Sequence, residues 1–311
     1  MKQFLVTGAA GFIGGAVASA LINQGHRVVT IDNLSTGFEE GVPNGVIFIK
    51  GDCQSAKVIK QLHEYNFDAI YHIAGQSSGE ISFDDPIYDL QTNTQSTLML
   101  LDFAKQTGVK HFIYASSMSV YGNHIALPVN EESTCSPVSF YAIGKLASEE
   151  YLKVYHQQYG INTVSLRLFN VYGPGQNMDN LRQGMISIFL AQALKSNHIL
   201  VKGSKDRFRD FVYIDDVVDA FLACQTIKGA KIYNVATNKK HTVEEITHNI
   251  RSQILGDCTV SYEGNTPGDM FGIFGDYSKI NADLGWRPKV NFQKGLNQMV
   301  LKMRHRSSFD Q

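Results

Sequence analysis

Two residues four positions apart, Tyr141 and Lys145, have the chemistry of a base and its charged helper. On a helix, residues at this spacing lie on one face, one turn apart, so both side chains can reach the same cleft. The phenol of an ordinary tyrosine has a pKa of about 10, and a cation next to it lowers that pKa by stabilising the phenolate. The pair can therefore act as a general base that removes a proton from an alcohol.

The pair is informative only beside a cofactor site, because a chain with 14 tyrosines meets a lysine at this spacing about once by chance. Such a site is indicated at the start of the chain. An apolar run at 3–7 leads into a glycine turn, an amphipathic stretch and a second apolar run that ends in Asp32. The turn contains Gly8, Gly11, Phe12, Ile13 and Gly14. Its glycines let the backbone approach a pyrophosphate, and the helix that follows offers free N–H groups to it.

Asp32 follows Gly14 at close to the spacing at which a carboxylate accepts hydrogen bonds from an adenosine ribose. Its charge would repel a 2′-phosphate, and residues 33–37 contain no arginine that could receive one. The pattern therefore predicts that the chain binds NAD rather than NADP.

Apolar runs alternate with helical stretches along the first half of the chain. Further strands are expected at 46–49, 69–73 and 111–115, with helices at about 55–65 and 86–106. This alternation predicts an α/β fold with a Rossmann-type, doubly wound parallel sheet. The residues after each strand then meet at the carboxyl edge of the sheet, where ligands bind in such folds.

Composition excludes several classes of protein. The net charge is −1 and no basic run occurs, which argues against nucleic acid as a partner. No apolar run has the length of a membrane span, and the first residues do not resemble a signal peptide, so we expect a cytoplasmic protein without membrane contact. The four cysteines are scattered and the histidines show no ligand spacing, so no metal site is expected.

Further motifs carry a specific resemblance: Thr7 to Gly14, Asp32-Asn33-Leu34, Gly51-Asp52, His72 to Gly75, Ala115-Ser116-Ser117, Val120-Tyr121-Gly122, Tyr141 to Lys145, Arg167 to Gly175, Arg209 to Val217 and Leu284 to Pro288. With them the chain resembles the extended short-chain dehydrogenase/reductase family in its nucleotide-sugar epimerase/dehydratase branch. Within that branch it is most similar to UDP-glucose and UDP-N-acetylglucosamine 4-epimerases.

The resemblance implies roles for particular residues. Ser117 would hydrogen-bond the sugar hydroxyl that is oxidised, Tyr141 would take its proton, and Lys145 would hold the nicotinamide ribose and lower the tyrosine pKa. The implied NAD-binding residues are Gly8, Gly11, Phe12, Ile13, Gly14, Asp32, Asn33, Asp52, Cys53, Ile73, Ala74, Gly75, Gln76, Asn93, Tyr141, Lys145 and Phe169. The implied substrate-binding residues are Gln76, Ser117, Ser119, Tyr141, Asn170, Met185, Arg209, Asp269 and Ile273.

The resemblance also implies how the chain is divided and assembled. Residues 1–172 and about 214–240 would form the NAD-binding domain. Residues of about 173–213 and 241–311 would form a smaller nucleotide-sugar lobe. The helices around 86–107 and 140–159 carry apolar stripes, and related enzymes pair these helices in a homodimer. The same stripes could instead only cover the sheet.

Met118 and Ser119 favour one reaction of this branch over another. The dehydratases resemble one another in placing an acidic pair directly after the catalytic hydroxyl, and here neither residue can do that work. A 4-epimerase needs only oxidation at C4, turning of the 4-keto sugar and return of the hydride to its other face, with NAD retained. The alternatives are a reductase or dehydrogenase acting on a nucleotide sugar, a dehydratase, an epimerase acting at C2 or C5, and a nucleotide-sensing protein.

Two departures from the epimerase pattern leave the substrate open. Thr266 stands where similar epimerases commonly carry an arginine for the diphosphate, so Arg209 would do more of that work, helped by Arg182 or Arg207. Ile273 stands at the position that resembles the gatekeeper for the sugar. Its size lies between the aromatic residue that suggests plain hexoses and the small residue that admits N-acetylated ones.

Overall fold

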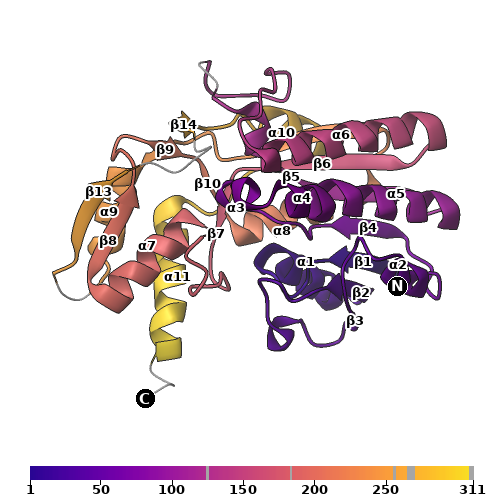
Figure 1. The fold of residues 1–311 in the computed structure, drawn as a ribbon, viewed down its shortest axis with the longest axis horizontal. Helices are drawn as coiled ribbons and strands as arrows, with labels where there is room; N and C mark the ends of the chain where they lie inside the picture. Colours follow the sequence, from indigo (N-terminus) through magenta and orange to yellow (C-terminus); the bar gives the residue numbers. More distant parts are fainter. Residues whose placement is uncertain (124–125, 183, 255–256, 265–269, 308–311) are drawn as a thin grey trace.

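The computed structural model describes residues 1–123, 126–182, 184–254, 257–264 and 270–307, and its centre is a seven-stranded parallel sheet (Figure 1). The strands lie in the order β11-β6-β5-β4-β1-β2-β3. Their bounds are β1 Gln3–Thr7, β2 Arg27–Asp32, β3 Ile47–Lys50, β4 Ala69–His72, β5 His111–Ser117, β6 Asn162–Leu168 and β11 Ala230–Val235. The chain runs outward from β1 in both directions, so the expected Rossmann-type doubly wound sheet is confirmed.

Helices cover both faces of this sheet because its strands bury side chains alternately on each side. Phe4 and Val6 of β1 pack in one apolar cluster with helices α1 (Phe12–Asn23) and α8 (Ile214–Ala223). Leu5, between them, packs in a second cluster on the other face. That face is covered by α2 (Ala56–Leu62), α5 (Ser96–Thr107) and α6 (Phe140–Tyr159).

The long helix expected from residue 86 is divided into three parts. After the short helix α3 (Gly79–Asp84), α4 spans Pro86–Leu90, and a π-helical turn at Gln91–Gln95 separates it from α5. Within and just after this turn, the hydroxyl groups of Thr92, Ser96 and Thr97 each donate to the carbonyl four residues earlier, at 2.6–2.9 Å. Such turns inside helices are frequently found at functional sites.

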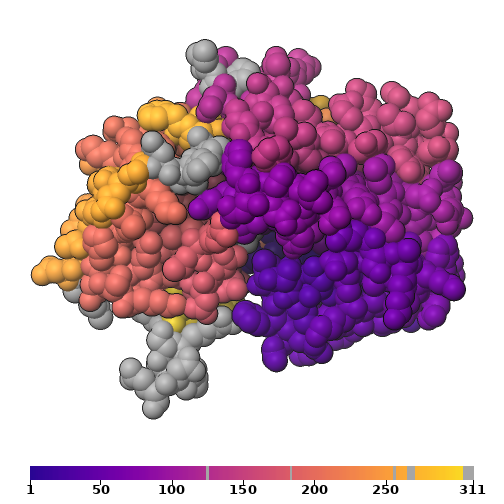
Figure 2. All heavy atoms as spheres, viewed as in Figure 1, coloured from indigo at the N-terminus to yellow at the C-terminus, as the bar shows by residue number. Residues whose placement is uncertain are grey.

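A smaller lobe packs beside the carboxyl edge of the sheet (Figures 1 and 2). Its strands form three small sheets, in the orders β10-β7, β12-β9-β14 and β13-β8. Their bounds are β7 Asn170–Tyr172, β8 His198–Lys202, β9 Phe208–Arg209, β10 Phe211–Tyr213, β12 His241–Thr242, β13 Thr259–Glu263 and β14 Gly272–Ile273. Its helices are α7 Met185–Ser196, α9 Val243–Arg251 and α11 Phe292–Ser307, while α10 Ser278–Leu284 packs against β11 of the large sheet. The space-filling view shows a hollow between the salmon-coloured lobe and the indigo N-terminal part.

The stretch from Leu284 to Pro288, singled out in the sequence, fastens the end of the lobe to α8. Trp286 is buried, and its indole Nε1 donates to the carbonyl of Asp216 at 2.9 Å. The carboxylate of Asp216 accepts from the N–H groups of Lys289 and Val290. Residues 214–235 lie with the large sheet, because α8 packs against α1 and β11 pairs with β6, while the expected division into domains stays a prediction.

A membrane-spanning helix and a metal-binding cluster each require a particular arrangement of residues, and the described part of the chain shows neither. Within the described ranges, no helix combines the length and the apolar character needed to cross a membrane. Nor do three or more His, Cys, Asp or Glu side chains of those ranges gather where they could hold a metal ion.

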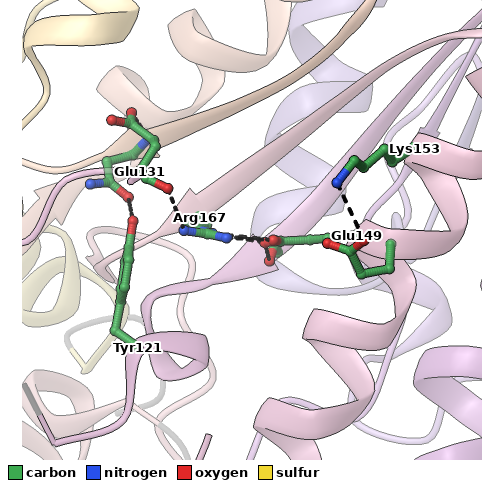
Figure 3. Close-up of polar contacts among 8 residues, drawn as sticks. Tyr121, Glu131, Glu149, Lys153 and Arg167 are labelled. Atoms are coloured by element: carbon green, nitrogen blue, oxygen red, sulfur yellow. Dashed lines mark hydrogen bonds and ion pairs between the residues drawn. The ribbon is translucent and has the colours of Figure 1, made fainter. Parts of the chain in front are cut away.

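A buried charge network joins α6 to strands β5 and β6 (Figure 3). Arg167 donates to both carboxylate oxygens of Glu149, at 2.7 Å and 3.0 Å, and both side chains are at most 4% exposed. Ser116 donates to the same carboxylate. The guanidinium of Arg167 lies 4.8 Å from the ring centre of Tyr121, whose hydroxyl donates to Asn234. Removing one member of such a buried pair leaves the other charge uncompensated.

We therefore expect Glu149→Gln to lower the free energy of unfolding by about 3–5 kcal/mol, because Arg167 would remain charged in a buried place. The neighbouring change Glu150→Gln is the matched control. Glu150 pairs with Lys153 at 3.6 Å on the surface, where both side chains are more than half exposed, so this change should lower stability by at most about 1 kcal/mol. Urea unfolding measures both variants, and equal losses would contradict the prediction.

Candidate active site

A cavity of about 1840 Å³ opens at the carboxyl edge of the large sheet and extends between the sheet and the lobe. It is lined by almost all of the residues expected to bind cofactor or substrate. From that set the lining contains Gly8, Gly11, Phe12, Ile13, Gly14, Asp32, Asn33, Asp52, Cys53, Ile73, Ala74, Gly75, Gln76, Ser117, Ser119, Tyr141, Lys145, Phe169, Asn170, Met185 and Arg209. Asp269 lies outside the described residues.

The glycine turn after β1 forms one wall of the cavity, and larger residues would not fit there. A Cβ on Gly14 would lie 2.1 Å from the carbonyl oxygen of Gly8. Gly8 itself has a φ of +80°, and a Cβ there would approach the backbone of Ala74 to 2.9 Å. No side chain caps the start of α1 and no acid lies in its first turn, so its free N–H groups face the turn.

Asp32, at the end of β2, is held in place by the main chain. One carboxylate oxygen accepts from the N–H of Ala10 at 2.9 Å and the other from that of Leu34 at 2.8 Å. Asn33 beside it donates to Asp52 at 2.6 Å. Burial raises the pKa of the nearby Cys53 thiol to about 12, helped by the charges of Asp32 and Asp52, so this cysteine is neutral.

Ser117, Tyr141 and Lys145 come together at the floor of the cavity. Ser117 ends β5, and Tyr141 and Lys145 occupy successive turns at the start of α6, which Ser139 caps by accepting from Ala142. Lys145 is 4% exposed, and its Nζ donates to the carbonyl of Ala115 at 2.9 Å. Its amine lies 5.7 Å from the ring centre of Tyr141 and does not hydrogen-bond the phenol directly.

Burial sets the charge states of these two groups. It raises the pKa of Tyr141 to about 12, against a hydrogen bond from Ser117 that favours the phenolate. It also lowers the pKa of Lys145 to about 8, against the charges of Asp89 and Glu149, which favour the protonated amine. The lowering of the tyrosine pKa that we expect from Lys145 stays a prediction, and a phenolate at this buried position needs added positive charge.

Ser117 is the centre of a small hydroxyl cluster. Its Oγ accepts from the hydroxyl of Ser119 at 3.0 Å and from the N–H of Ser119 at 3.2 Å. Next to it, the amide of Asn170 contacts the sulfur of Met118 at 3.6 Å and donates to the carbonyl of Asp210 at 3.0 Å. The cavity wall beyond Ser117 is therefore made of hydroxyl, amide and thioether groups.

Arg209 lines the cavity, but its guanidinium is bound to main-chain carbonyls, whereas Ile273 lies apart from the cavity lining. Arg209 is 2% exposed, and its guanidinium donates to the carbonyls of Phe208, Met270 and Phe271, so it fastens β9 to the segment before β14. Ile273 is fully buried in the core and is not among the described residues that line the cavity. Arg182 and Arg207 do line it; Arg182 pairs with Asp84, and Arg207 donates to the carbonyl of Lys202.

His72, at the end of β4, lies behind the cavity wall and was not among the residues expected to bind cofactor or substrate. Thr97 and Ser96 each donate their hydroxyl hydrogen to a main-chain carbonyl, so they can only accept from the imidazole Nε2, at 3.1 Å and 3.3 Å. The other nitrogen, Nδ1, then accepts from Thr7 at 2.9 Å. Thr7 in turn accepts from the N–H groups of Ile73 and Ala74. The ring is neutral, because burial lowers its pKa to about 3.

The chain belongs to the NAD dependent epimerase/dehydratase family, whose model matches residues 4–236. The UDP-glucose 4-epimerase of Mycolicibacterium smegmatis is 33% identical over 310 residues, covering 97% of this chain and 99% of that protein. The structure of the Thermotoga maritima UDP-glucose 4-epimerase with UDP-glucose matches at a TM-score of 0.95 and 32% identity, covering 98% and 99%. The Thermus thermophilus UDP-glucose 4-epimerase in complex with NAD matches at 0.91 and 34%, covering 97% and 99%.

The cavity fits the NAD that the family name implies. Side chains in the glycine turn would clash with the neighbouring backbone, so the turn stays narrow and a bound group can approach its main chain. The uncapped start of α1 suits a pyrophosphate. Asp32 presents acceptor oxygens suited to ribose hydroxyls. Asn93 is behind the wall rather than in it, yet its Oδ1 is buried without a hydrogen-bond partner in the described part of the chain, beside Gly75.

The neutral state of His72 makes the stability of the fold depend on pH. A histidine in the unfolded chain has a pKa of about 6.5, whereas that of His72 in the folded chain is about 3. The unfolded chain therefore takes up a proton that the folded chain does not, and stability is lost as pH falls from 6.5 towards 3. Between pH 7 and pH 5 this group should lower the free energy of unfolding by about 2 kcal/mol.

Urea unfolding of wild type and His72→Gln at both pH values measures this effect. The variant loses hydrogen bonds and starts less stable, but it has no proton to gain, so its further loss on acidification should be smaller by about 2 kcal/mol. Parallel losses in the two proteins would show that His72 is not the titrating group.

Proposed function

We propose that this protein interconverts the C4 epimers of a UDP-linked hexose, either the glucose/galactose pair or the N-acetylated pair, with NAD retained between turnovers. The observation that carries the proposal is the group of Ser117, Tyr141 and Lys145 at the floor of one cavity with the glycine turn and Asp32. The similarity to UDP-glucose 4-epimerases along nearly the whole chain supports the same reaction.

In this proposal Tyr141 takes the proton of the sugar hydroxyl and later returns it. Ser117, which already hydrogen-bonds Tyr141, orients that hydroxyl. Bound NAD supplies a reversible hydride acceptor, so the reaction needs no added oxidant or reductant. The phenolate requires more positive charge than the protein alone provides, and Lys145, one helical turn away, is the contribution of this chain to it.

The residues around Ser117 favour epimerisation over elimination of water. Met118 and Ser119 line the cavity directly after Ser117, and neither can carry a proton as a carboxylate does. Asn170 faces Met118 and would contact the substrate. Arg209 is tied to three carbonyls, so in our proposal it shapes the diphosphate site mainly by fixing residues 270 and 271, with Arg182 and Arg207 nearby on the cavity wall.

Proton NMR of the purified protein tests this function. UDP-glucose, UDP-N-acetylglucosamine and UDP-glucuronic acid are supplied in separate tubes without added NAD. We expect a new anomeric signal from the 4-epimer in at least one of the first two tubes, and the faster tube identifies the sugar class. Silence in all tubes, repeated with NAD added, would overturn the proposal, and loss of carboxylate only from UDP-glucuronic acid would indicate a decarboxylase.

Tyr141→Phe tests the base in the same assay. The substitution removes only the hydroxyl, so NAD should remain bound while the turnover rate falls by about 10²–10⁴-fold. The amount of NAD released from the denatured variant serves as the control for an intact cofactor site. A variant that keeps both NAD and the wild-type rate would exclude Tyr141 as the base.

We further propose that the protein is a homodimer that pairs the helices at one edge of the molecule. Large apolar side chains on α3, α4 and α6 are exposed where these helices pack side by side: Phe83, Ile87, Leu90, Phe140, Ile143 and Val154, each at least 41% exposed. The rings of Phe83 and Phe140 lie 5.5 Å apart, which makes the apolar surface continuous between α3 and α6. Continuous apolar patches of this kind mark association surfaces.

Ile143→Lys should therefore shift the protein from dimer to monomer in sedimentation velocity at micromolar concentration. Ile143 is 52% exposed at the middle of the patch, and a buried lysine would meet its copy or an apolar surface across the contact. Leu301→Lys on α11 is the matched control, since Leu301 is 55% exposed but lies away from these helices. A monomeric wild-type protein, or equal behaviour of the two variants, would contradict the dimer.

A further inference from the structure

Asp89 is a buried acid near the cavity, and no role for it is expected from the sequence. It lies in α4, one helical turn before Asn93, and is 1% exposed. Its Oδ1 accepts from two side-chain amides, Gln76 Nε2 at 2.8 Å and Asn93 Nδ2 at 3.0 Å. Burial raises the pKa of this carboxyl group, while the two amides and the charge of Lys145 favour its ionised form. Asp89 is thus bound by Gln76 and Asn93, two residues that we expect to bind the cofactor.

An ionised carboxylate only accepts hydrogen bonds, so both amides must turn their NH₂ groups towards Asp89. With the NH₂ groups turned this way, the amide oxygens, Gln76 Oε1 and Asn93 Oδ1, point away from Asp89. Gln76 Oε1 accepts from the N–H of Ser78. Asn93 Oδ1 is left without a hydrogen-bond partner in the described part of the chain, although Asn93 is only 1% exposed. Asp89 shares this role with the main-chain carbonyl of Gln76, which accepts from the same Asn93 NH₂ group at 2.9 Å, and together they leave Oδ1 turned towards Gly75.

The unpartnered oxygen is aimed at a gap in the cavity wall. A Cβ on Gly75 would lie 2.4 Å from Asn93 Oδ1 and 3.5 Å from Lys145 Nζ. Because Gly75 has no side chain, the acceptor oxygen and the ammonium group approach the same point of the lining. A hydroxyl group at that point could donate to Asn93 and accept from Lys145, which is the hydrogen-bonding pattern that a ribose hydroxyl offers.

Gly144 allows the two helices to approach closely enough for this arrangement. A Cβ at Gly144 would lie 3.2 Å from Thr94 Oγ1, in the π-helical turn, and 3.5 Å from Asp89 Oδ2. Thr94 also donates to the carbonyl of Gly144 at 3.3 Å. The close contact brings Lys145, the next residue of α6, within electrostatic range of Asp89.

The charged and titratable groups around Lys145 come from several elements. Asp89 of α4 and Glu149 of α6 favour its protonated form, while burial opposes it. His72 of β4 is neutral, and its own pKa is lowered further by Lys145. The ring centre of Tyr114 lies 4.8 Å from the amine and that of Tyr141 5.7 Å. Glu149 is already neutralised by Arg167, which leaves Asp89 as the carboxylate in this set that is not paired with an arginine.

We propose that Asp89 is a positioning residue of the cofactor site, which orients the amides of Gln76 and Asn93 and keeps Lys145 protonated, so that Asn93 Oδ1 and the Lys145 ammonium bind the cofactor ribose together. The proposal rests on NAD binding in this cavity. It does not depend on which sugar is turned over, and its main readout is cofactor binding rather than catalysis.

Asp89→Asn tests the proposal in the Tyr141→Phe background, which binds NAD without turnover. An amide at position 89 weakens the hold on the neighbouring amides, which retain the carbonyls of Ser78 and Gln76 as acceptors, and it removes a negative charge near Lys145. We expect the NAD content after desalting to fall several-fold. Titration of NAD binding by fluorescence from about pH 6 to about pH 10 should show binding weakening at lower pH than in the parent, by about one unit, because Lys145 loses its proton more easily.

Asp216→Asn is the matched control, because Asp216 is also 1% exposed and accepts from two N–H groups. These belong to Lys289 and Val290, which are not among the described residues that line the cavity, whereas Gln76, a partner of Asp89, is. It should lower thermal stability without changing the NAD content or the pH at which binding weakens. Asp89→Asn with parental NAD content and an unshifted pH profile would overturn the proposal, and so would an equal pH shift in Asp216→Asn.

Asn93→Ser keeps the proposal testable if Asp89→Asn does not fold. It removes the unpartnered oxygen but leaves the charge of Asp89 in place. The NAD content should fall, whereas the pH at which binding weakens should stay where it is in the parent. Full NAD content in this variant would show that Asn93 Oδ1 does not contribute to the cofactor site.

Discussion

The burial of one positive charge, that of Lys145, is the constraint around which this structure is arranged. An ammonium group that is 4% exposed has lost nearly all its water and must be compensated by the protein. A carbonyl at the end of β5 accepts from it, an aromatic ring lies beneath it, and carboxylates approach from α4 and α6. The second of these carboxylates is bound to Arg167, which continues the chain of charges into β6. The strand ends and helices around the cavity are thus held together by the same electrostatic requirement.

The two sides of the cavity differ in how tightly their residues are held by packing and hydrogen bonds. On the sheet side, glycines without room for a side chain, a clamped Asp32 and a neutral His72 leave little freedom for the main chain. On the lobe side, basic residues such as Arg182 are half exposed and bound to surface acids. A rigid cofactor side suits a group that stays bound, and a more open polar side suits a substrate that enters and leaves at each turnover.

Local patterns in the sequence were enough to predict five strands of the parallel sheet, the glycine turn and the placing of Tyr141 and Lys145 on one helix face, because each depends on residues that are neighbours in the chain. The unexpected findings come from contacts between distant segments. Arg209 is expected from the sequence to bind the diphosphate, but the sequence does not show that its guanidinium also donates to the carbonyls of residues 270 and 271. Ile273 lies in the core because β14 pairs with β9. Asp89 could have been noticed, since it stands one helical turn before Asn93, but nothing local indicates that α6 would bring a lysine beside it.

The buried Glu149–Arg167 pair also has a consequence for temperature. The penalty for removing charged groups from water falls as temperature rises, because their hydration is entropically unfavourable. A pair that is nearly neutral in its net effect near 25 °C therefore becomes more favourable under hot conditions, without any change of residue. The relatives of similar structure from Thermotoga maritima and Thermus thermophilus show that this architecture occurs in organisms that grow in heat. The internal ion pair between α6 and β6 therefore contributes to this fold an interaction whose desolvation cost falls on heating.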